Sequence, residues 1–195
     1  MSNTARSAYV MAFLLTCIFT LTACTSVIHG VTDTPLQPNP SKTTVGTDLD
    51  DWQMNTLVGV NIKKAAKQLS DSHININTYN KVVLLTGEVP SASLRTLAGS
   101  TARNYPGVRQ VYNELQLRGS SGMLARTNDS WLTGKLKTRL LFTRGIQSGS
   151  VNVITEGGVI YLMGMLEHTQ ADQIATIASR TGGALKVIRV FEYLD

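Results

Sequence analysis

A stretch that occurs twice decides the fold: ININTYNKVVLLTG at residues 74–87 and VNVITEGGVIYLMG at residues 151–164. Each stretch places apolar residues on both sides of a short polar turn, Asn80-Lys81 or Gly157-Gly158, which is typical of a β-hairpin. A glycine closes each stretch at the same offset. A repeat at a separation of about 77 residues predicts two copies of one structural unit.

Outside each hairpin, the apolar residues change to helical spacing. Ser91 and Thr169 are the predicted N-caps of the helix that follows each hairpin. Its predicted apolar positions are Leu94, Leu97, Ala98 and Thr101 in the first copy and Ala171, Ile174, Ala175 and Ala178 in the second.

A last strand is expected at 108–117 and again at 185–194. A further helix is expected before each hairpin, at about 51–69 and 129–142. Gly59 lies inside the first of these helices and weakens it by about 1 kcal/mol. The predicted fold class is therefore α+β, with the order αββαβ twice and a small three-stranded sheet packed by two helices in each copy.

The predicted domain organisation has five parts. A signal peptide occupies residues 1–23, a flexible tether 24–46, the first copy 47–118, a linker 119–128 and the second copy 129–195. The tether is predicted from three prolines among polar residues. Each copy is near the lower size limit for an independent core, so we expect the two copies to pack together.

The N-terminal stretch has an apolar run that ends at Leu21-Thr22-Ala23-Cys24. This motif resembles the lipobox of bacterial lipoproteins, and the resemblance implies a diacylglyceryl thioether on Cys24, an acylated N-terminus such as a palmitate, and cleavage before Cys24. Thr25 stands where Asp favours retention at the inner membrane, so the resemblance implies an outer-membrane protein on the periplasmic face. The alternative is an ordinary signal peptide that leaves Cys24 free. Cys17 departs with the leader in either case, so no disulfide is expected.

Composition and motifs argue against several function classes. The 195 residues are 43% hydrophobic and carry a formal net charge of +5 without a Lys/Arg run, so nucleic acid is not an expected partner. His29, His73 and His168 are isolated in the sequence. None has a cysteine, a histidine or a carboxylate at the spacing that would place both ligands on one face. Asp50 and Asp51 are expected to cap or precede the first helix. No catalytic, metal or cofactor site is therefore predicted, and the protein is not expected to be an enzyme.

Two short motifs carry a family resemblance. Val83-Leu84-Leu85-Thr86-Gly87 and Gly107-Val108-Arg109-Gln110-Val111 resemble the BON domain. Two such domains behind a lipobox are similar to the dual-BON outer-membrane lipoproteins, some of which carry a haemolysin label. In the second copy, Gly183-Ala184-Leu185-Lys186-Val187 keeps only the glycine and the last valine of the second motif.

The helix expected at 129–142 carries an unusual face. Leu132, Leu136 and Leu140 form one stripe, predicted to face the core. Trp131, Lys135 and Phe142 fall within about 40° of one another on a different side at about 100° per residue. Aromatic rings beside cations suit a membrane interface, because rings settle at the headgroups and cations attract anionic lipid. The alternative is that Trp131 and Phe142 pack against the first copy.

In proteins that this chain resembles, the corresponding helix of the second BON domain binds anionic phospholipid, with a tryptophan at the position of Trp131. The resemblance carries over to Trp131, Lys135 and Leu141, while Arg139 and Phe142 are added from this sequence. It also implies a role in envelope integrity, with enrichment at cell division sites. A protein-binding envelope adaptor and a protein associated with haemolysis are the alternative functions, and an envelope protein is the alternative partner.

Overall fold

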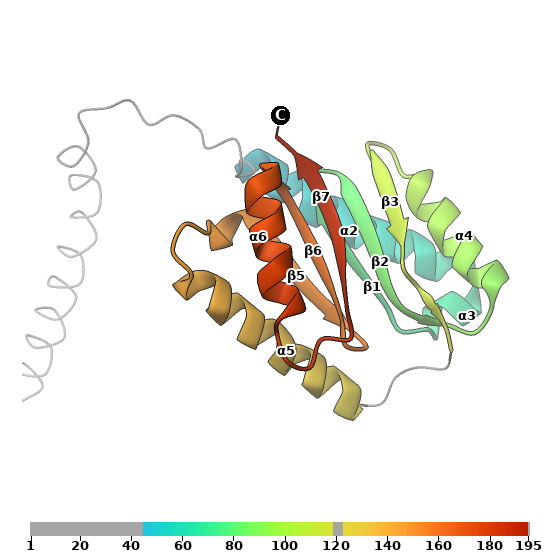
Figure 1. Ribbon diagram of the computed structural model, residues 1–195. Helices are drawn as coiled ribbons and strands as arrows, with labels where there is room; N and C mark the ends of the chain where they lie inside the picture. The colour runs from blue at the N-terminus through green and yellow to red at the C-terminus, as the bar shows by residue number, and fades with distance from the viewer. Residues whose placement is uncertain (1–44, 119–122, 195) are drawn as a thin grey trace, which may run out of the picture. The chain divides into compact units, whose positions relative to one another are not determined.

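The computed structural model describes residues 45–118 and 123–194. The predicted signal peptide, Cys24, His29, the tether up to residue 44 and Gly119–Gly122 lie outside these described residues. The first copy contains α2 (Val45–Ala65), α3 (Lys67–Ser70), β1 (Ile74–Tyr79), β2 (Val82–Val89), α4 (Ala92–Arg103), β3 (Gln110–Asn113) and β4 (Gln116–Leu117). The second contains α5 (Met123–Phe142), a 3₁₀ turn (Ser148–Ser150), β5 (Val151–Glu156), β6 (Val159–Leu166), α6 (His168–Ser179) and β7 (Lys186–Tyr193) (Figure 1).

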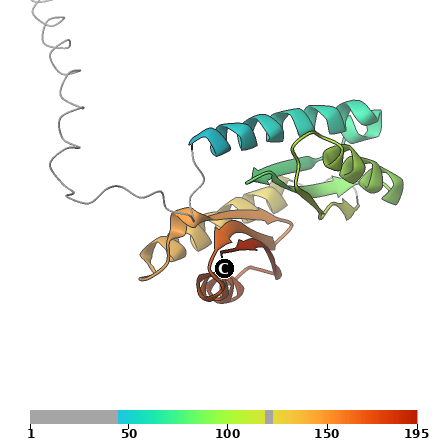
Figure 2. The same cartoon turned by 90° about the horizontal axis from the view of Figure 1, so that it is seen from above.

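The two sheets have the same topology. β2 pairs with β1 in antiparallel register and with β3 in parallel register, and β6 pairs with β5 and β7 in the same way. The predicted last strand of the first copy is interrupted, because Leu115 turns fully into the helix-side core between β3 and β4. The predicted α+β fold of two αββαβ units is confirmed, and helices cover one face of each sheet (Figures 1 and 2).

Several helix boundaries differ from the prediction. α2 begins at Val45, six residues before the predicted start, and continues through Gly59 to Ala65. A Cβ on Gly59 would lie 3.4 Å from the Ile76 side chain, so the glycine lets β1 pack closely on the helix. α5 begins at Met123, so residues 123–128 of the expected linker are helical.

One predicted helix cap is confirmed and the other is wrong. The Ser91 hydroxyl accepts a hydrogen bond from the Leu94 backbone N–H at 3.3 Å and caps α4 as predicted. Thr169 lies inside α6, whose N-cap residue is Glu167, and Glu167 makes no side-chain capping bond. The sequence contains an acceptable capping residue at 169, but the helix begins one residue before it.

An aspartate from the preceding helix holds each hairpin turn. Asn80 and Lys81 both have positive φ, at 48° and 63°, and their outward-facing N–H groups donate to the two carboxylate oxygens of Asp51 at 2.5 and 2.8 Å. In the second copy, Gly157 and Gly158 donate to Asp129, both at 2.8 Å. The predicted capping role of Asp51 is therefore wrong, because its carboxylate bonds a distant turn and not its own helix. Burial raises the pKa of Asp51, while the two N–H donors act in the opposite direction.

The glycine that ends each repeated stretch marks a close approach between two backbone segments. A Cβ on Gly87 would lie 2.1 Å from the His73 carbonyl oxygen, and a Cβ on Gly164 would lie 2.4 Å from the Ser150 carbonyl oxygen. Neither distance is sterically allowed, so both positions require glycine. The equal offset of the two glycines in the sequence therefore reflects one shared backbone crossing.

The central strands β2 and β6 bury both of their faces. In β2, Val83 and Leu85 point to the helix-side core, while Val82 and Leu84 point to a separate apolar cluster. That cluster also contains Tyr161 and Met163 of β6 and Val190 of β7. The two copies therefore pack through the sheet faces that their helices leave uncovered, which confirms the expected packing.

Polar contacts surround this apolar cluster between the copies. The Asn80 side-chain amide donates to Glu192 at 2.8 Å, and Arg109 forms an ion pair with the same carboxylate. On another strand, the Asn75 amide donates to Glu156 at 2.6 Å. Each of these contacts joins the first copy to the second.

We expect Asp129→Asn to lower the free energy of unfolding by about 1–3 kcal/mol, because an amide replaces one of two acceptors and leaves a turn N–H without its partner. Chemical denaturation of the wild type and the variant measures this change. Asp71→Asn is the matched control, because Asp71 is exposed. Equal losses in the two variants would contradict a structural role for the Asp129 contact.

We expect Tyr161 to make stability sensitive to alkaline pH. Burial, and then the charges of Glu114 and Glu156, raise the pKa of Tyr161 from 10.0 to about 12. Its contribution of about 3 kcal/mol is fully present below pH 10 and is lost as the pH rises through 12, because unfolding releases the proton more easily. Burial also raises the pKa of Tyr79, so ultraviolet titration should show more than one late tyrosine, and Tyr161→Phe should remove one of these late components. A wild-type titration with no late component would contradict this.

Candidate functional site

The buried side of α5 sets the orientation of the whole helix. Leu132, Leu136 and Leu140 are 0%, 0% and 1% exposed and belong to the core of the second copy. Asp129, one turn earlier, is held by the Gly157-Gly158 turn. The predicted core stripe is confirmed, and these contacts determine which residues of α5 face outward.

Three large apolar side chains lie on the outward side of α5. Trp131 is 58% exposed, Leu141 64% and Phe142 80%. Burial of such side chains is normally favourable by about 1.5–3 kcal/mol each, so three exposed ones on one helix make this face a candidate interaction surface. The alternative in which Trp131 and Phe142 are buried against the first copy is not what the structure shows.

Two cations beside these rings bond to the loop after α6. The Lys135 ammonium lies 4.7 Å from the Trp131 ring centroid and donates to the Gly182 carbonyl at 3.2 Å. The Arg139 guanidinium donates to the Arg180 carbonyl at 3.1 Å. Cations at these carbonyls complement the C-terminal end of α6. Lys135 and Arg139 therefore stay exposed and charged but are held in position.

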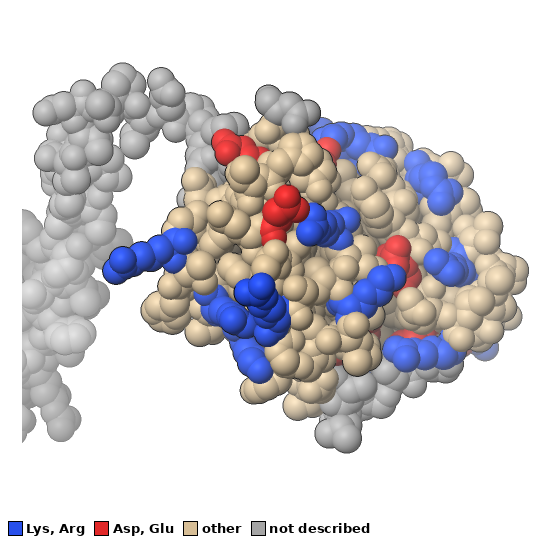
Figure 3. All heavy atoms as spheres, viewed as in Figure 1, with Lys and Arg blue, Asp and Glu red and all other residues tan. Residues whose placement is uncertain are grey.

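Basic residues also border the other side of the apolar group. Lys137 is exposed on α5, and Arg144 is exposed two residues after the helix ends. At about 100° per residue, Leu141 and Phe142 lie between Lys137 and Lys135 on the helix surface. Lys and Arg side chains gather over the region where α5 and the end of α6 lie (Figure 3). The predicted site residues did not include Lys137 and Arg144, although the first lies within the expected helix 129–142 and the second two residues after it.

We use the name α5 surface for Trp131, Lys135, Lys137, Arg139, Leu141, Phe142 and Arg144. It combines exposed apolar side chains with cations on both sides, all on α5 except Arg144, which follows the end of the helix. Such an arrangement can bind an anionic, partly apolar surface without any covalent chemistry.

The two histidines within the described residues have different surroundings. The His168 ring stacks on Tyr193 at a centroid distance of 3.9 Å. His73 lies beside two carboxylates, Glu88 and Glu156. The expectation that His73 has no potential co-ligand nearby is therefore wrong, because the β1–β2 hairpin brings Glu88 close and tertiary packing brings Glu156 from more than 80 residues away.

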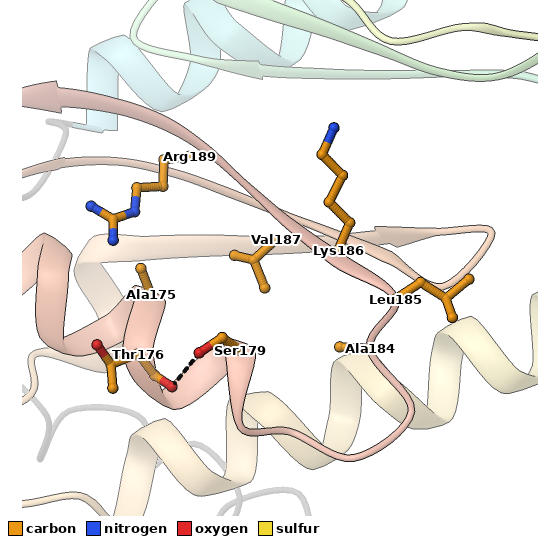
Figure 4. Close-up of a pocket in the computed structure, with 8 residues that line it drawn as sticks. All are labelled: Ala175, Thr176, Ser179, Ala184, Leu185, Lys186, Val187 and Arg189. Atoms are coloured by element: carbon orange, nitrogen blue, oxygen red, sulfur yellow. Dashed lines mark hydrogen bonds between the residues drawn. The ribbon is translucent and has the colours of Figure 1, made fainter.

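A hollow of about 330 Å³ lies between α6 and β7 (Figure 4). Small side chains such as Ala175 and Ala184 line it, and the Ser179 hydroxyl donates to the Thr176 carbonyl at 2.9 Å. Arg189 at its edge pairs with Asp172 at 2.6 Å. Its lining pairs no nucleophile with a base, so this hollow does not suggest catalysis.

Within the described ranges, none of the helices combines the length and apolar character that crossing a bilayer requires.

Comparisons with known proteins agree with the fold. The BON domain model matches residues 55–119 and 128–195. The chain is 32% identical to "Outer membrane lipoprotein DolP" of Haemophilus influenzae over 95% of this chain and 96% of that protein. It is 34% identical to "21 kDa hemolysin" of Actinobacillus pleuropneumoniae over 86% of this chain and 84% of that protein.

A further relative is "Osmotically-inducible protein Y" of Escherichia coli, with 29% identity over 61% of each chain. The two matched ranges correspond to the two αββαβ units, and the similarity to the H. influenzae protein extends over nearly the full length of both chains. The chain therefore belongs to the BON domain family and carries two copies of the domain.

Proposed function

We propose that this protein is an outer-membrane lipoprotein, anchored through Cys24 on the periplasmic face, that binds anionic phospholipid through the α5 surface. The observation that carries the binding proposal is the exposure of Trp131, Leu141 and Phe142 beside four basic residues on or next to one helix. The name of the H. influenzae relative supports the location.

The energetics favour a weak, reversible contact by the α5 surface. Each cation near an anionic headgroup contributes about 1 kcal/mol, and the rings add the burial of apolar area at the headgroup level. An acylated Cys24 would keep the protein at the membrane, so the second contact would form at a high effective concentration. The α5 surface would then set the orientation of the folded body on the lipid.

The proposed biological role is support of envelope integrity, with enrichment at division sites. A surface that prefers anionic lipid would concentrate wherever such lipid is enriched.

Two further functions follow from the same surface or from the relatives. The exposed rings could bind an envelope protein in place of lipid, and the name of the A. pleuropneumoniae relative adds haemolysis as a candidate. Dose-dependent lysis of erythrocytes by the purified chain would support the last of these.

We expect the 25–195 fragment to co-sediment with vesicles that contain anionic phosphatidylglycerol and not with neutral phosphatidylcholine vesicles. Trp131→Ala should weaken binding severalfold. Lys135→Gln with Arg139→Gln should weaken it by about 25-fold, because each cation contributes about 1 kcal/mol. High salt should weaken wild-type binding in the same direction.

Matched controls come from the first copy. Trp52→Ala removes a tryptophan that is 67% exposed on α2, and Lys63→Gln with Lys64→Gln removes two exposed α2 cations. These variants should bind vesicles like the wild type. Binding that does not depend on anionic lipid, or losses that are equal in the α2 and α5 variants, would reject the α5 surface as the lipid site. Capture of an envelope protein without lipid would favour the adaptor function.

We expect the mature chain to begin at an acylated Cys24. Mass spectrometry of the N-terminal peptide from the native host should show the added acyl mass on Cys24. Cys24→Ser should release the protein from the membrane fraction, while Cys17→Ser should leave it there. An unmodified mature N-terminus would instead identify an ordinary signal peptide.

A further inference from the structure

A histidine and two glutamates meet where the two BON domains contact each other. His73 precedes β1 and Glu88 lies near the end of β2, both in the first domain, while Glu156 ends β5 in the second. One side-chain ligand atom from each residue lies within 4.8 Å of the other two. These groups are therefore separated in sequence but concentrated in one place by the packing of the domains.

The Asn75 amide lies against both His73 and Glu156. The Asn75 amide nitrogen donates to Glu156 Oε2 at 2.6 Å, and the same nitrogen lies 3.2 Å from His73 Nε2. In the tautomer with the ring proton on Nδ1, the Nε2 lone pair accepts from this amide. The neutral ring with a lone pair at Nε2 is the form that binds metal ions.

The lone pair of His73 faces another acceptor. His73 Nε2 lies 3.5 Å from Glu156 Oε1, and in this tautomer no proton lies between the two atoms. Two ligands of a tetrahedral zinc ion are about 3.3 Å apart, given metal–ligand bonds of about 2.0–2.1 Å. The observed separation is close to that value, so a cation between the two atoms would replace repulsion with attraction.

Both carboxylates are buried, and basic side chains lie near them. The side chains of Glu88 and Glu156 are 0% and 7% exposed, and that of His73 is 22% exposed. Arg118 pairs with Glu88 at 3.2 Å but is itself 51% exposed, so its side chain can move to water. Arg126 lines the adjoining hollow, together with His73 and Glu156. Buried carboxylates usually require a paired charge or a bound metal ion.

The repeat supplies an internal comparison. The hairpin register aligns His73 with Ser150, Glu88 with Met165, and Glu156 with Tyr79. None of these three aligned residues is a histidine or a carboxylate, and the carboxylate that lies beside them, Glu192, is paired with Arg109. The repeated fold therefore does not itself require a histidine with two glutamates at this position.

We propose that His73, Glu88 and Glu156 form a binding site for a first-row divalent metal ion, with Zn²⁺ as the preferred probe. A mixed set of one imidazole nitrogen and two carboxylate oxygens suits Zn²⁺ better than Ca²⁺ or Mg²⁺, which prefer oxygen ligands alone. The ion would take ligands from both domains and would hold the two domains together. Glu88 would shift from Arg118 toward the ion.

The test uses the full chain in detergent, stripped of metal, with Cys17→Ser and Cys24→Ser so that no thiol binds zinc. Calorimetric titration with Zn²⁺ should give saturable binding with one ion per chain, and Zn²⁺ should raise the melting temperature. Ca²⁺ and Mg²⁺ at the same concentrations should have no such effect. Substituted Co²⁺ should give the visible absorption of a four-coordinate site, with water as the fourth ligand.

Variants assign the binding to these residues. His73→Ala and Glu156→Gln should each weaken Zn²⁺ binding at least tenfold, because each removes one ligand. Loss of a residue that only hydrogen-bonds a ligand already weakens metal binding about 10–100-fold. His168→Ala and His29→Ala are the matched controls and should bind like the wild type. Circular dichroism checks that each variant is folded. If a variant is not folded, the Co²⁺ spectrum of the parent chain still tests whether the site binds a metal ion.

Three results would overturn the proposal. These are the absence of saturable Zn²⁺ binding, unchanged binding in His73→Ala, and a melting temperature that Zn²⁺ does not change. The last would leave the His73–Glu156 contact as a structural one in place of a metal site. Vesicle binding is measured separately. Failure of the zinc proposal therefore leaves the lipid proposal unaffected, and failure of lipid binding leaves the zinc proposal unaffected.

Discussion

The bond from a helix carboxylate to the two N–H groups of a hairpin turn is the contact on which each BON domain depends. A two-residue turn with positive φ at both positions directs its N–H groups away from the hairpin, where the strands cannot accept them. Asp51 and Asp129 accept them from the helices that precede β1 and β5. One side chain therefore sets the turn, the height of the helix on the sheet and the rotation of the helix. In the second domain, that rotation points Trp131 outward.

Local patterns in the sequence contained much of this architecture. The turn residues between apolar runs located both hairpins, and the leucine stripe at 132, 136 and 140 identified the core face of α5. The outward position of Trp131 followed from the same spacing. These features depend on residues that are close in sequence, so periodicity could reveal them.

The features that the sequence did not reveal depend on long-range contacts. Asp51 looked like a helix cap because local capping uses the same chemistry that binds the turn about 30 residues later. The early start of α5 was missed because Met123–Asn128 follows a Gly-Ser stretch that is typical of a linker. His73 looked isolated because its carboxylate neighbours come from another strand and another domain. Spacing along one chain cannot identify groups that only tertiary packing brings together.

The double-sided burial of β2 and β6 has a consequence for the order in which the protein is made. The first domain is synthesised, and under the proposed location exported, before the second, so Val82 and Leu84 have no partner until Tyr161 and Met163 follow about 80 residues later. The nascent first domain thus presents an uncovered apolar strand face at the time when folding intermediates aggregate most readily. A chain interrupted between the domains would keep that face exposed permanently. Each half of this protein is therefore the folding partner of the other.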